Sequence, residues 1–218
     1  MSRAATPLPC PLCGGCTGRE PHPGYTLCET CGLARLAPHR RLTPAAERAH
    51  YLTHENDPGD ERYRRFLERL AGPMMRRVVP PAHGLDYGSG PGPTLSVMLQ
   101  ERGYTMSLYD PFFAPDAAAL ARQYEFVTCS ETAEHFHQPG EQFARLDGLV
   151  RTGGWLGVMT CLFDAGAPGF DFGDWWYRRD PTHVCFYQPR TMRWLAERFG
   201  WRVTFEGATV VMFEKPAR

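Results

Sequence analysis

The stretch Leu85-Asp86-Tyr87-Gly88-Ser89-Gly90-Pro91-Gly92 decides how the second half of this sequence folds. It places a D-x-G-x-G-x-G pattern between a short apolar run at 84–87 and a helix expected at 93–102. Glycines let a backbone approach a ligand closely, and the first turn of a helix has free amide groups. A dinucleotide-binding turn reads G-x-G-x-x-G, whereas Pro93 stands where its last glycine belongs, so the pattern disfavours NAD.

Strands and helices alternate from this turn to the end of the chain. Strands are expected at 84–87, 104–109, 125–129 and 155–161, and helices at 93–102, 115–122, 139–151 and 189–199. The run Thr152-Gly153-Gly154 is expected to end the helix at 139–151. Two more β-rich runs, 202–206 and 209–214, are separated only by two residues, so the last strand should be antiparallel to its neighbour. The predicted fold class is α/β, a Rossmann-like doubly wound sheet with an antiparallel last strand.

Two aspartates stand at the ends of consecutive strands. Asp86 is placed to receive an ammonium group. Asp110 follows 24 residues later, where an acidic side chain accepts both hydroxyls of a ribose. The alternative for Asp110, a cap on the turn before Pro111, stays open.

The segment 84–214 resembles class I S-adenosylmethionine-dependent methyltransferases. Residues 86–92 resemble the first motif of that family, Asp110 the second, and Gly153-Gly154-Trp155 a later one. The resemblance implies S-adenosylmethionine as cofactor, held by Asp86, Tyr87, Gly88, Ser89, Gly90, Gly92, Asp110, Pro111, Phe112, Cys129 and Ser130.

The sequence departs from this family between its second and third expected strands. Only about 15 residues separate Asp110 from the strand at 125–129. The family's usual third strand, with its acidic adenine-contacting loop, is therefore expected to be shortened or lost. Adenine would then lie against Phe112, Phe113 and the backbone near Cys129.

A cluster of acidic residues and histidines follows the strand at 125–129. Glu131, Glu134 and His135 share one face if this segment forms a helical turn. The E-x-x-E-H pattern resembles the magnesium-binding cluster of ubiquinone-pathway O-methyltransferases and small-RNA 2′-O-methyltransferases, with His183 as the downstream histidine. Three interpretations stay open: Mg on Glu131, Glu134, His135 and His183, a metal-free base at His135 or His183, or a structural role. The catalytic candidates are His135, His183 and Glu134.

An aromatic-rich loop precedes His183. Residues 170–180 contain Phe170, Phe172, Trp175, Trp176 and Tyr177, together with two arginines. Long ordered loops in compact domains are often lids or binding loops. The loop would therefore cover an aromatic, sugar or nucleotide acceptor; the alternative is that it packs on the sheet edge and the N-terminal segment.

Five of the eight cysteines lie within the first 31 residues. Cys10-Pro-Leu-Cys13 and Cys28-Glu-Thr-Cys31 are two C-x2-C knuckles at a spacing that closes a tetrahedral zinc site. Four thiolates leave no open coordination position, so the predicted zinc is structural. Cys16 is a spare thiol able to replace Cys13. Unmetallated thiols in a flexible arm are the alternative.

The sequence thus predicts three segments: a small zinc ribbon at 1–42, a helical connector at 43–83 with an amphipathic helix at 60–77, and an S-adenosylmethionine-dependent methyltransferase domain at 84–218. The expected acceptor is a small molecule, aromatic or sugar-containing. Two alternatives remain, an RNA-directed methyltransferase that docks through the ribbon and a non-catalytic S-adenosylmethionine-binding protein.

Composition bears on partners and location. The 218 residues contain 24 basic and 24 acidic side chains, and this zero net charge makes a nucleic-acid partner less favoured. No uncharged apolar run reaches the ~18 residues of a membrane helix. The first seven residues contain no apolar core of a secretory signal, so a cytoplasmic location is expected. The sequence does not indicate an oligomeric state.

Overall fold

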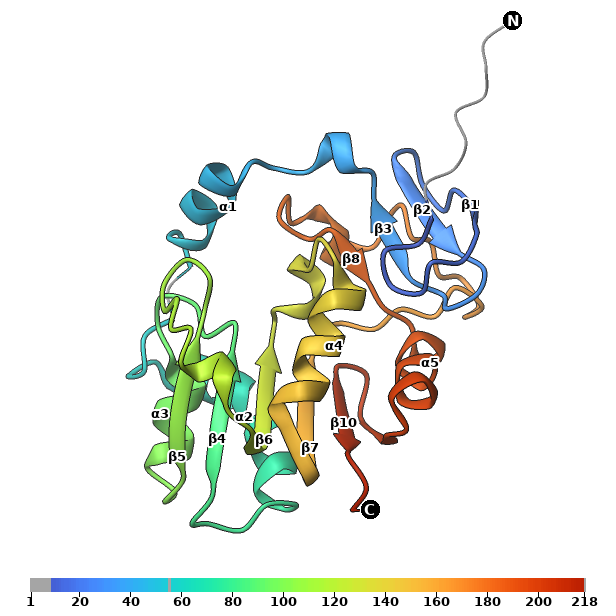
Figure 1. Ribbon diagram of the computed structural model, residues 1–218. Coiled ribbons are helices and arrows are strands. Elements are labelled where there is room, and N and C mark those ends of the chain that lie inside the picture. The colour runs from blue at the N-terminus through green and yellow to red at the C-terminus, as the bar shows by residue number, and fades with distance from the viewer. Residues whose placement is uncertain (1–8, 55, 218) are drawn as a thin grey trace, which may run out of the picture.

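The computed structural model describes residues 9–54 and 56–217 (Figure 1). The first eight residues, on which the expectation of no secretory signal rests, lie outside the described residues. Within the two described ranges, no helix combines the length and the apolar character that a membrane crossing requires.

A six-stranded sheet forms the centre of the molecule, with strand order β5-β4-β6-β7-β10-β9. Its strands are β4 (His83–Tyr87), β5 (Thr105–Tyr109), β6 (Tyr124–Ser130), β7 (Val150–Met159), β9 (Arg202–Glu206) and β10 (Val210–Glu214). The pairs β4–β5, β4–β6 and β6–β7 are parallel, and β10 is antiparallel to both β7 and β9. The predicted Rossmann-like α/β class is therefore confirmed. The sheet ends at β5, as the short segment after Asp110 predicts.

Helices cover both faces of this sheet. On one face lie α2 (Glu61–Met75) and α3 (Thr94–Gln100), and on the other α4 (Pro139–Leu149) and α5 (Pro189–Phe199). In Figure 1, α4 crosses in front of the sheet. Alternate residues of a strand point to opposite faces, and β10 shows this directly. Met212 packs with the α2 and α3 residues, whereas Val211 and Phe213 pack with α4 and α5.

Two expected elements near the sheet are wrong in detail. The helix expected at 139–151 ends at Leu149, and β7 begins at Val150, so Thr152-Gly153-Gly154 lies inside the strand. Gly153 adopts φ 77°, and the β6–β7 register shifts beside it. These glycines therefore form an irregularity in the strand instead of ending a helix. The helix expected at 115–122 is only a 3-10 turn, Ala119–Ala121.

A second, smaller sheet joins the N-terminal segment to a distant loop. Its order is β1 (Thr17–Arg19), β2 (Tyr25–Cys28), β3 (Ala34–Leu36) and β8 (Cys185–Phe186). Ala34 pairs with Phe186, and the Leu36 N–H donates to the Val184 carbonyl at 2.9 Å. A strand therefore follows the aromatic-rich loop. This strand fixes the segment that carries His183.

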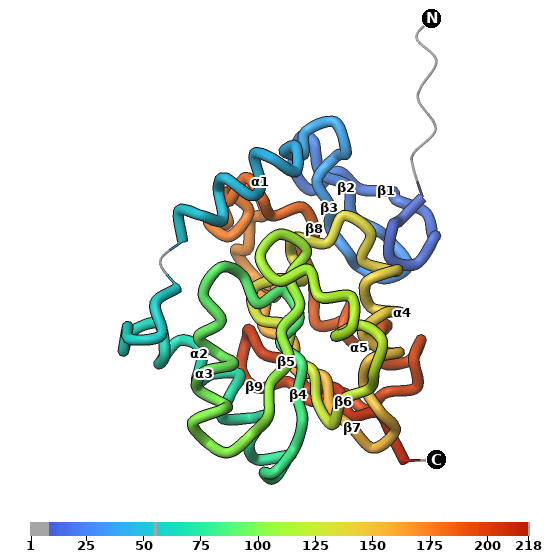
Figure 2. Tube along the Cα trace, turned by 60° about the vertical axis from the view of Figure 1, so that its left-hand side comes forward, coloured from blue at the N-terminus to red at the C-terminus, as the bar shows by residue number. Residues whose placement is uncertain are grey.

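Helix α1 (Pro44–Tyr51) lies in the segment that connects the small sheet to the large one. The Thr43 hydroxyl accepts the Ala46 N–H and caps the helix start, with Pro44 in the first turn. Figures 1 and 2 show α1 above the carboxyl ends of the parallel strands. In this fold, ligands bind in the crevice at that edge, so α1 lies over the expected ligand site.

Candidate active site

A cavity of about 920 Å³ opens at the carboxyl ends of β4, β5 and β6. Among the predicted cofactor residues, the lining includes Asp86, Tyr87, Gly88, Ser89, Gly90, Gly92, Asp110, Pro111, Phe112 and Ser130. Phe113 also lines it, whereas Cys129 is fully buried in the core and does not. The glycine turn and the end of the second strand therefore face one space.

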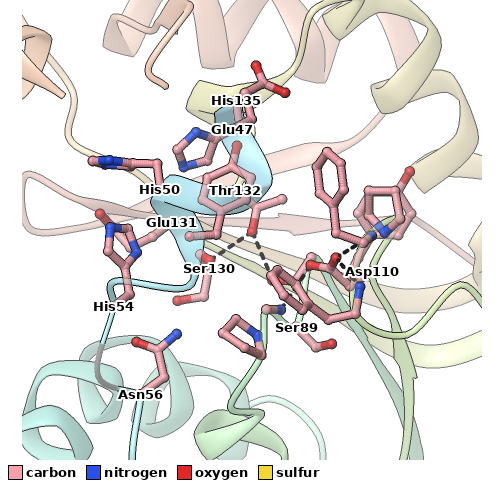
Figure 3. Close-up of a pocket in the computed structure, with 18 of the residues that line it drawn as sticks. Glu47, His50, His54, Asn56, Ser89, Asp110, Ser130, Glu131, Thr132 and His135 are labelled. Atoms are coloured by element: carbon pink, nitrogen blue, oxygen red, sulfur yellow. Dashed lines mark hydrogen bonds between the residues drawn. The ribbon is translucent and has the colours of Figure 1, made fainter. Parts of the chain in front are cut away.

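The glycine turn packs directly on the loop that follows β6. Gly88 adopts φ 82° and Gly90 φ 63°, a conformation that L side chains rarely adopt. A Cβ on Gly88 would lie 2.2 Å from Thr132 Cγ2. The Thr132 hydroxyl lies 3.2 Å from the Gly88 carbonyl and 2.9 Å from the Ser130 carbonyl, both within hydrogen-bond distance (Figure 3). The turn and the acidic loop are thus held together.

Asp86 is buried beneath the turn. Its Oδ2 accepts the Ser96 hydroxyl at 3.0 Å, and its Oδ1 accepts the Thr128 hydroxyl at 2.9 Å. Burial raises the pKa of Asp86 to about 6, although both hydrogen bonds oppose the shift. The side chain therefore ties β4 to α3 and β6 while lining the cavity.

Asp110 connects two loops of the site. Its Oδ1 accepts the N–H groups of Phe112 at 2.8 Å and Phe113 at 3.1 Å, and its Oδ2 accepts the Gly90 N–H at 2.9 Å. The carboxylate thus caps the turn after β5, as one of the two sequence interpretations expects. Asp110 also lines the cavity beside the glycine turn, which is the position that the other interpretation, binding of ribose hydroxyls, requires.

Two serine hydroxyls on this side of the cavity indicate that it binds a polar ligand. Among the residues that the structure describes, Ser89 Oγ and Ser130 Oγ are buried atoms without a hydrogen-bond partner. Buried polar groups in folded proteins almost always have such a partner. Both residues line the cavity near Asp110 or Thr132 (Figure 3). These residues therefore fit a ligand that offers polar groups of its own.

Three of the predicted acceptor-side residues converge at the opposite end of the cavity. One ligand atom from each of Glu134, His135 and His183 lies within 4.8 Å of the others. His135 Nδ1 is 3.1 Å from the Thr182 carbonyl, and His183 Nδ1 is 2.7 Å from the Tyr177 carbonyl. Because a carbonyl only accepts, each Nδ1 donates, and in the neutral ring Nε2 then keeps its lone pair. Burial lowers the pKa of His183, which favours its neutral form.

The two glutamates of this cluster differ in position. Glu134 is fully buried behind the cavity wall, and its Oε1 accepts the Tyr177 hydroxyl at 2.6 Å. Glu131 lines the cavity in a left-handed conformation, φ 45°, 3.4 Å from the same hydroxyl. Burial, and then the charge of Glu134, raise the pKa of Glu131 to about 9. Tyr177 thus bridges the pair, and Glu131 stands outside the converging group.

The converging group has the chemistry of a divalent cation site. Glu134 Oε2 has no hydrogen-bond partner among the described residues, and two imidazole Nε2 atoms stand nearby. Metal-binding histidines usually donate the other ring N–H to a carbonyl or carboxylate, as His135 and His183 do here. Imidazole suits zinc, iron or nickel better than magnesium. The residues therefore fit a divalent cation, with a donor set less suited to magnesium.

Side chains of α1 form the roof of the cavity, a feature that the sequence analysis missed. Glu47 Oε1 lies 2.7 Å from His137 Nε2, and His50 Nε2 lies 3.4 Å from Asp180 Oδ2. The Tyr51 ring lies 5.2 Å from the His135 ring, centroid to centroid. The signals available were the Thr43-Pro44 helix start and the histidines at 50 and 54, one helical turn apart.

The aromatic loop divides between its two expected roles. Phe172 and Trp175 pack on Phe186 of the small sheet, with ring centroids 5.5 and 5.8 Å apart. Trp176 and Tyr177 line the cavity, and the Trp176 side chain is largely exposed at its edge. One half of the loop therefore anchors it, and the other half forms part of the site.

The four knuckle cysteines converge at the far end of the small sheet. Cys10 Sγ lies 3.6 Å from Cys31 Sγ, and Cys13 Sγ lies 3.4 Å from Cys28 Sγ. A tetrahedral zinc with bonds of about 2.3 Å sets its sulfurs about 3.8 Å apart, so the four thiols fit such an ion. Cys16 is exposed and outside this group.

Comparisons with known proteins agree with this geometry. The chain resembles a 1,6-didemethyltoxoflavin-N1-methyltransferase from Burkholderia thailandensis, solved with 1,6-didemethyltoxoflavin and S-adenosylhomocysteine bound. The two are 15% identical, with a TM-score of 0.58 over 92% of this chain and 100% of that chain. The solved structure of TnmH is 14% identical, with a TM-score of 0.56 over 79% of this chain and 59% of that chain. These likenesses show the fold. No curated protein matches the sequence significantly.

A family model described as a methyltransferase domain matches residues 51–205. The match spans the glycine turn, Asp110 and the Glu134–His135–His183 group, which together line or support one cavity. The predicted enzyme class, a methyltransferase, is thereby confirmed, and the chain belongs to the methyltransferase domain family.

Proposed function

We propose that this methyltransferase takes its methyl group from S-adenosylmethionine and transfers it to a small-molecule acceptor, aromatic or sugar-containing. The observation that carries the proposal is one cavity with two chemically different ends. The glycine turn and Asp110 lie at one end, and His135 and His183 lie at the other.

The end with the glycine turn suits the cofactor. Asp110 supplies carboxylate oxygens for ribose hydroxyls, and Phe112 and Phe113 supply apolar surface for adenine. The unpartnered hydroxyls of Ser89 and Ser130 supply further hydrogen bonds. Bound there, S-adenosylmethionine would supply a methyl group activated by its sulfonium.

The other end suits a proton-bearing acceptor. The acceptor heteroatom would attack the methyl carbon while the carbon–sulfur bond breaks, and its proton would pass to His135 Nε2. The carbonyl of Thr182 holds the His135 ring in the tautomer that leaves Nε2 free. Glu134 does not line the cavity, so it is a positioning residue that acts through Tyr177 and His183. Helix α1, whose side chains line the cavity, would exclude water and align the reactants.

Metal assistance is the alternative to proton transfer onto His135, because His135 Nε2 has one lone pair and binds either the proton or an ion. Glu134, His135 and His183 would hold a divalent cation, which would polarise an acceptor hydroxyl and lower its pKa. Glu131 would stay outside this set.

We also propose that Cys10, Cys13, Cys28 and Cys31 hold a structural zinc. The sulfur spacing supports a closed tetrathiolate site, and the exposed Cys16 would not take part. The division into a ribbon at 1–42, a connector at 43–83 and a methyltransferase domain at 84–218 remains a prediction, as does the cytoplasmic location. The β3–β8 pairing makes the ribbon part of the frame that holds His183.

Calorimetric titration with S-adenosylmethionine tests the cofactor half. Micromolar binding, about −8 kcal/mol, is expected for the natural chain. Asp110→Asn keeps an oxygen for the Phe112 N–H but removes the charge, and we expect it to weaken binding at least about tenfold, 1.4 kcal/mol. Asp116→Asn is the matched control, because Asp116 is exposed on the same loop and does not line the cavity. Equal affinity in all three proteins contradicts the proposed cofactor site.

A panel of aromatic and sugar-containing small molecules, with methyl-labelled S-adenosylmethionine, tests the acceptor half. We expect His135→Ala to lose label transfer while it retains cofactor affinity. Binding without transfer to any acceptor would instead support a non-catalytic binding protein. Transfer to RNA alone, with an affinity that falls steeply with salt, would support the RNA-directed alternative.

A further inference from the structure

A second group of metal-ligating side chains lies at the rim of the cavity, outside the predicted cluster. His50, His54 and Asp180 each offer a ligand atom within 4.8 Å of the other two. His50 is in α1, His54 lies one turn further along the chain, and Asp180 follows the 3-10 turn Trp176–Arg179. Figure 3 shows the two histidines on the same side of the pocket, opposite Ser89 and Asp110.

The spacing of these atoms suits a metal bound by nitrogen and oxygen. His50 Nε2 is 3.4 Å from Asp180 Oδ2. Tetrahedral bonds of about 2.0–2.1 Å set two ligand atoms about 3.4 Å apart. His54 lies just beyond the end of α1, and its ring centroid is 5.2 Å from that of His50. The ligand atom of His54 lies within 4.8 Å of those of His50 and Asp180, so the three residues form one ligand set.

Asp180 is prepared for the role of ligand. Its Oδ1 accepts both the backbone N–H of Thr182 at 2.8 Å and the Thr182 hydroxyl, so Oδ2 is the oxygen that faces His50. Carboxylates that ligate metals are usually hydrogen-bonded in this way. Burial opposes the charge, yet the Thr182 hydrogen bonds lower the pKa of Asp180. The carboxylate is therefore ionised at neutral pH.

Two histidines and one carboxylate form the donor set of open sites that keep a position for water or substrate. All three residues line the cavity, so the open position would face the acceptor end. The ligands come from two separate segments, α1 with its following turn and the loop at 176–183. An ion there would join the roof of the cavity to its wall.

We propose that His50, His54 and Asp180 bind a late first-row divalent metal ion, such as zinc or cobalt, which fastens α1 over the cavity. This inference goes beyond the proposed function, because binding of the ion requires neither S-adenosylmethionine nor an acceptor. The ion is distinct from the one that Glu134, His135 and His183 would hold, and His54 belongs only to the new set.

Cobalt(II) titrated into cofactor-free protein that has been loaded with one equivalent of zinc is the test. Zinc occupies the cysteines first, so cobalt held by imidazole and carboxylate gives visible d–d absorption without a sulfur charge-transfer band. Loss of a supporting hydrogen bond to a ligand costs about 10–100-fold in metal affinity. We therefore expect Thr182→Val to bind cobalt about tenfold more weakly, and His54→Ala or Asp180→Asn at least about 100-fold more weakly. His39→Ala, an exposed histidine outside the cavity, is the matched control and should bind as the natural chain does.

Trypsin cleavage after Arg48, an exposed residue of α1, reports on the roof. Cobalt should slow this cleavage in the natural chain and in His39→Ala, but not in Asp180→Asn. The proposal is overturned if His54→Ala binds cobalt as tightly as the natural chain, or if only Glu134→Gln removes the absorption. It is also overturned if cobalt binds but leaves cleavage after Arg48 unchanged. Calorimetry with S-adenosylmethionine on the same preparations reports separately on the proposed function.

Discussion

Burial places two carboxyl groups of the site outside their usual titration range. Asp86 lies under the glycine turn and Glu131 at the acceptor end, and burial is the largest cause of both raised pKa values. In each case hydroxyl groups stand close enough to share a proton or accept one. Glu131 therefore contributes little negative charge at neutral pH, whereas Asp86 is ionised there at the cost of its burial.

Replacement of Asp86 tests this cost of burial through the pH dependence of stability. The pKa of Asp86 is near 3.8 in the unfolded chain and about 6 in the folded chain, so the folded chain retains the proton to higher pH. In that window the unfolded state binds fewer protons, so the natural chain loses stability as pH rises. Asp86→Asn has no such loss. Urea unfolding at pH 4 and pH 7 should show the stability of Asp86→Asn, relative to the natural chain, rising by about 2 kcal/mol.

A stability difference that stays constant between those two pH values would contradict a raised pKa at Asp86. The hydrogen bonds from Ser96 and Thr128 are present at both pH values, so their loss or rearrangement shifts both measurements alike. The pH-dependent part therefore isolates the ionisation of one buried group.

The contact between the glycine turn and the loop after β6 connects the two ends of the cavity. Gly88→Ala would force a Cβ to within 2.2 Å of Thr132. A left-handed conformation alone costs an alanine about 1–2 kcal/mol. We expect Gly88→Ala to lose more stability than this, and to bind S-adenosylmethionine at least about tenfold more weakly in calorimetry, because the turn must move off Thr132.

Gly153→Ala supplies the matched control for that collision. Gly153 has φ 77°, close to the 82° of Gly88, but a Cβ there would meet no atom within 4 Å. It should lose about 1–2 kcal/mol without losing cofactor affinity. Thr132→Ala, added to Gly88→Ala, removes the colliding atoms and should restore part of the affinity. If both glycine variants bind S-adenosylmethionine equally well, packing between the turn and the loop does not shape the cofactor site.

Local sequence patterns predicted most of the elements of the large sheet, because each strand and helix carries its own periodicity and turn residues. The run 202–206 is a strand with those bounds, and 189–199 is a helix with those bounds. Strand β8 is only two residues long and forms against β3, about 150 residues earlier in the chain, so no local pattern marks it. The sequence places Gly153 at a helix end, where glycines with positive φ are common. Such glycines also occur at strand irregularities, and Gly153 is one of these.

The same limit applies to the site. Spacing along the chain brought Glu134 and His135 together, and the resemblance added His183. The sequence could not show that Glu134 lies behind the cavity wall or that Tyr177 bridges Glu131 and Glu134. Both facts depend on how the loop at 170–183 packs. The sequence also could not show that α1 forms the roof of the cavity. The contacts of α1 with Asp180 and His137 join segments about 90 to 130 residues apart.

On the scale of the whole molecule, the cysteine ribbon and the active site share one hydrogen-bonded path. β3 follows the second cysteine knuckle and pairs with β8. The Val184 carbonyl accepts the Leu36 N–H at 2.9 Å, and the Val184 N–H donates to the Glu134 carbonyl at 2.8 Å. Val184 directly follows His183. The ribbon therefore holds the acceptor end of the cavity, whereas the glycine turn and Asp110 follow strands β4 and β5 of the large sheet.

Disruption of the ribbon should for this reason separate the two ends of the cavity. Cys31→Ser removes one buried member of the cysteine group, and Cys16→Ser changes an exposed cysteine outside it. We expect Cys31→Ser to lose bound zinc and to exchange the Val184 amide hydrogen much faster, because β3 no longer holds β8. Affinity for S-adenosylmethionine should change little, and Cys16→Ser should match the natural chain in all three measurements. Zinc loss without faster exchange at Val184 would show that the small sheet holds its shape without the metal. A loss of S-adenosylmethionine affinity in Cys31→Ser would show that the ribbon supports the large sheet as well.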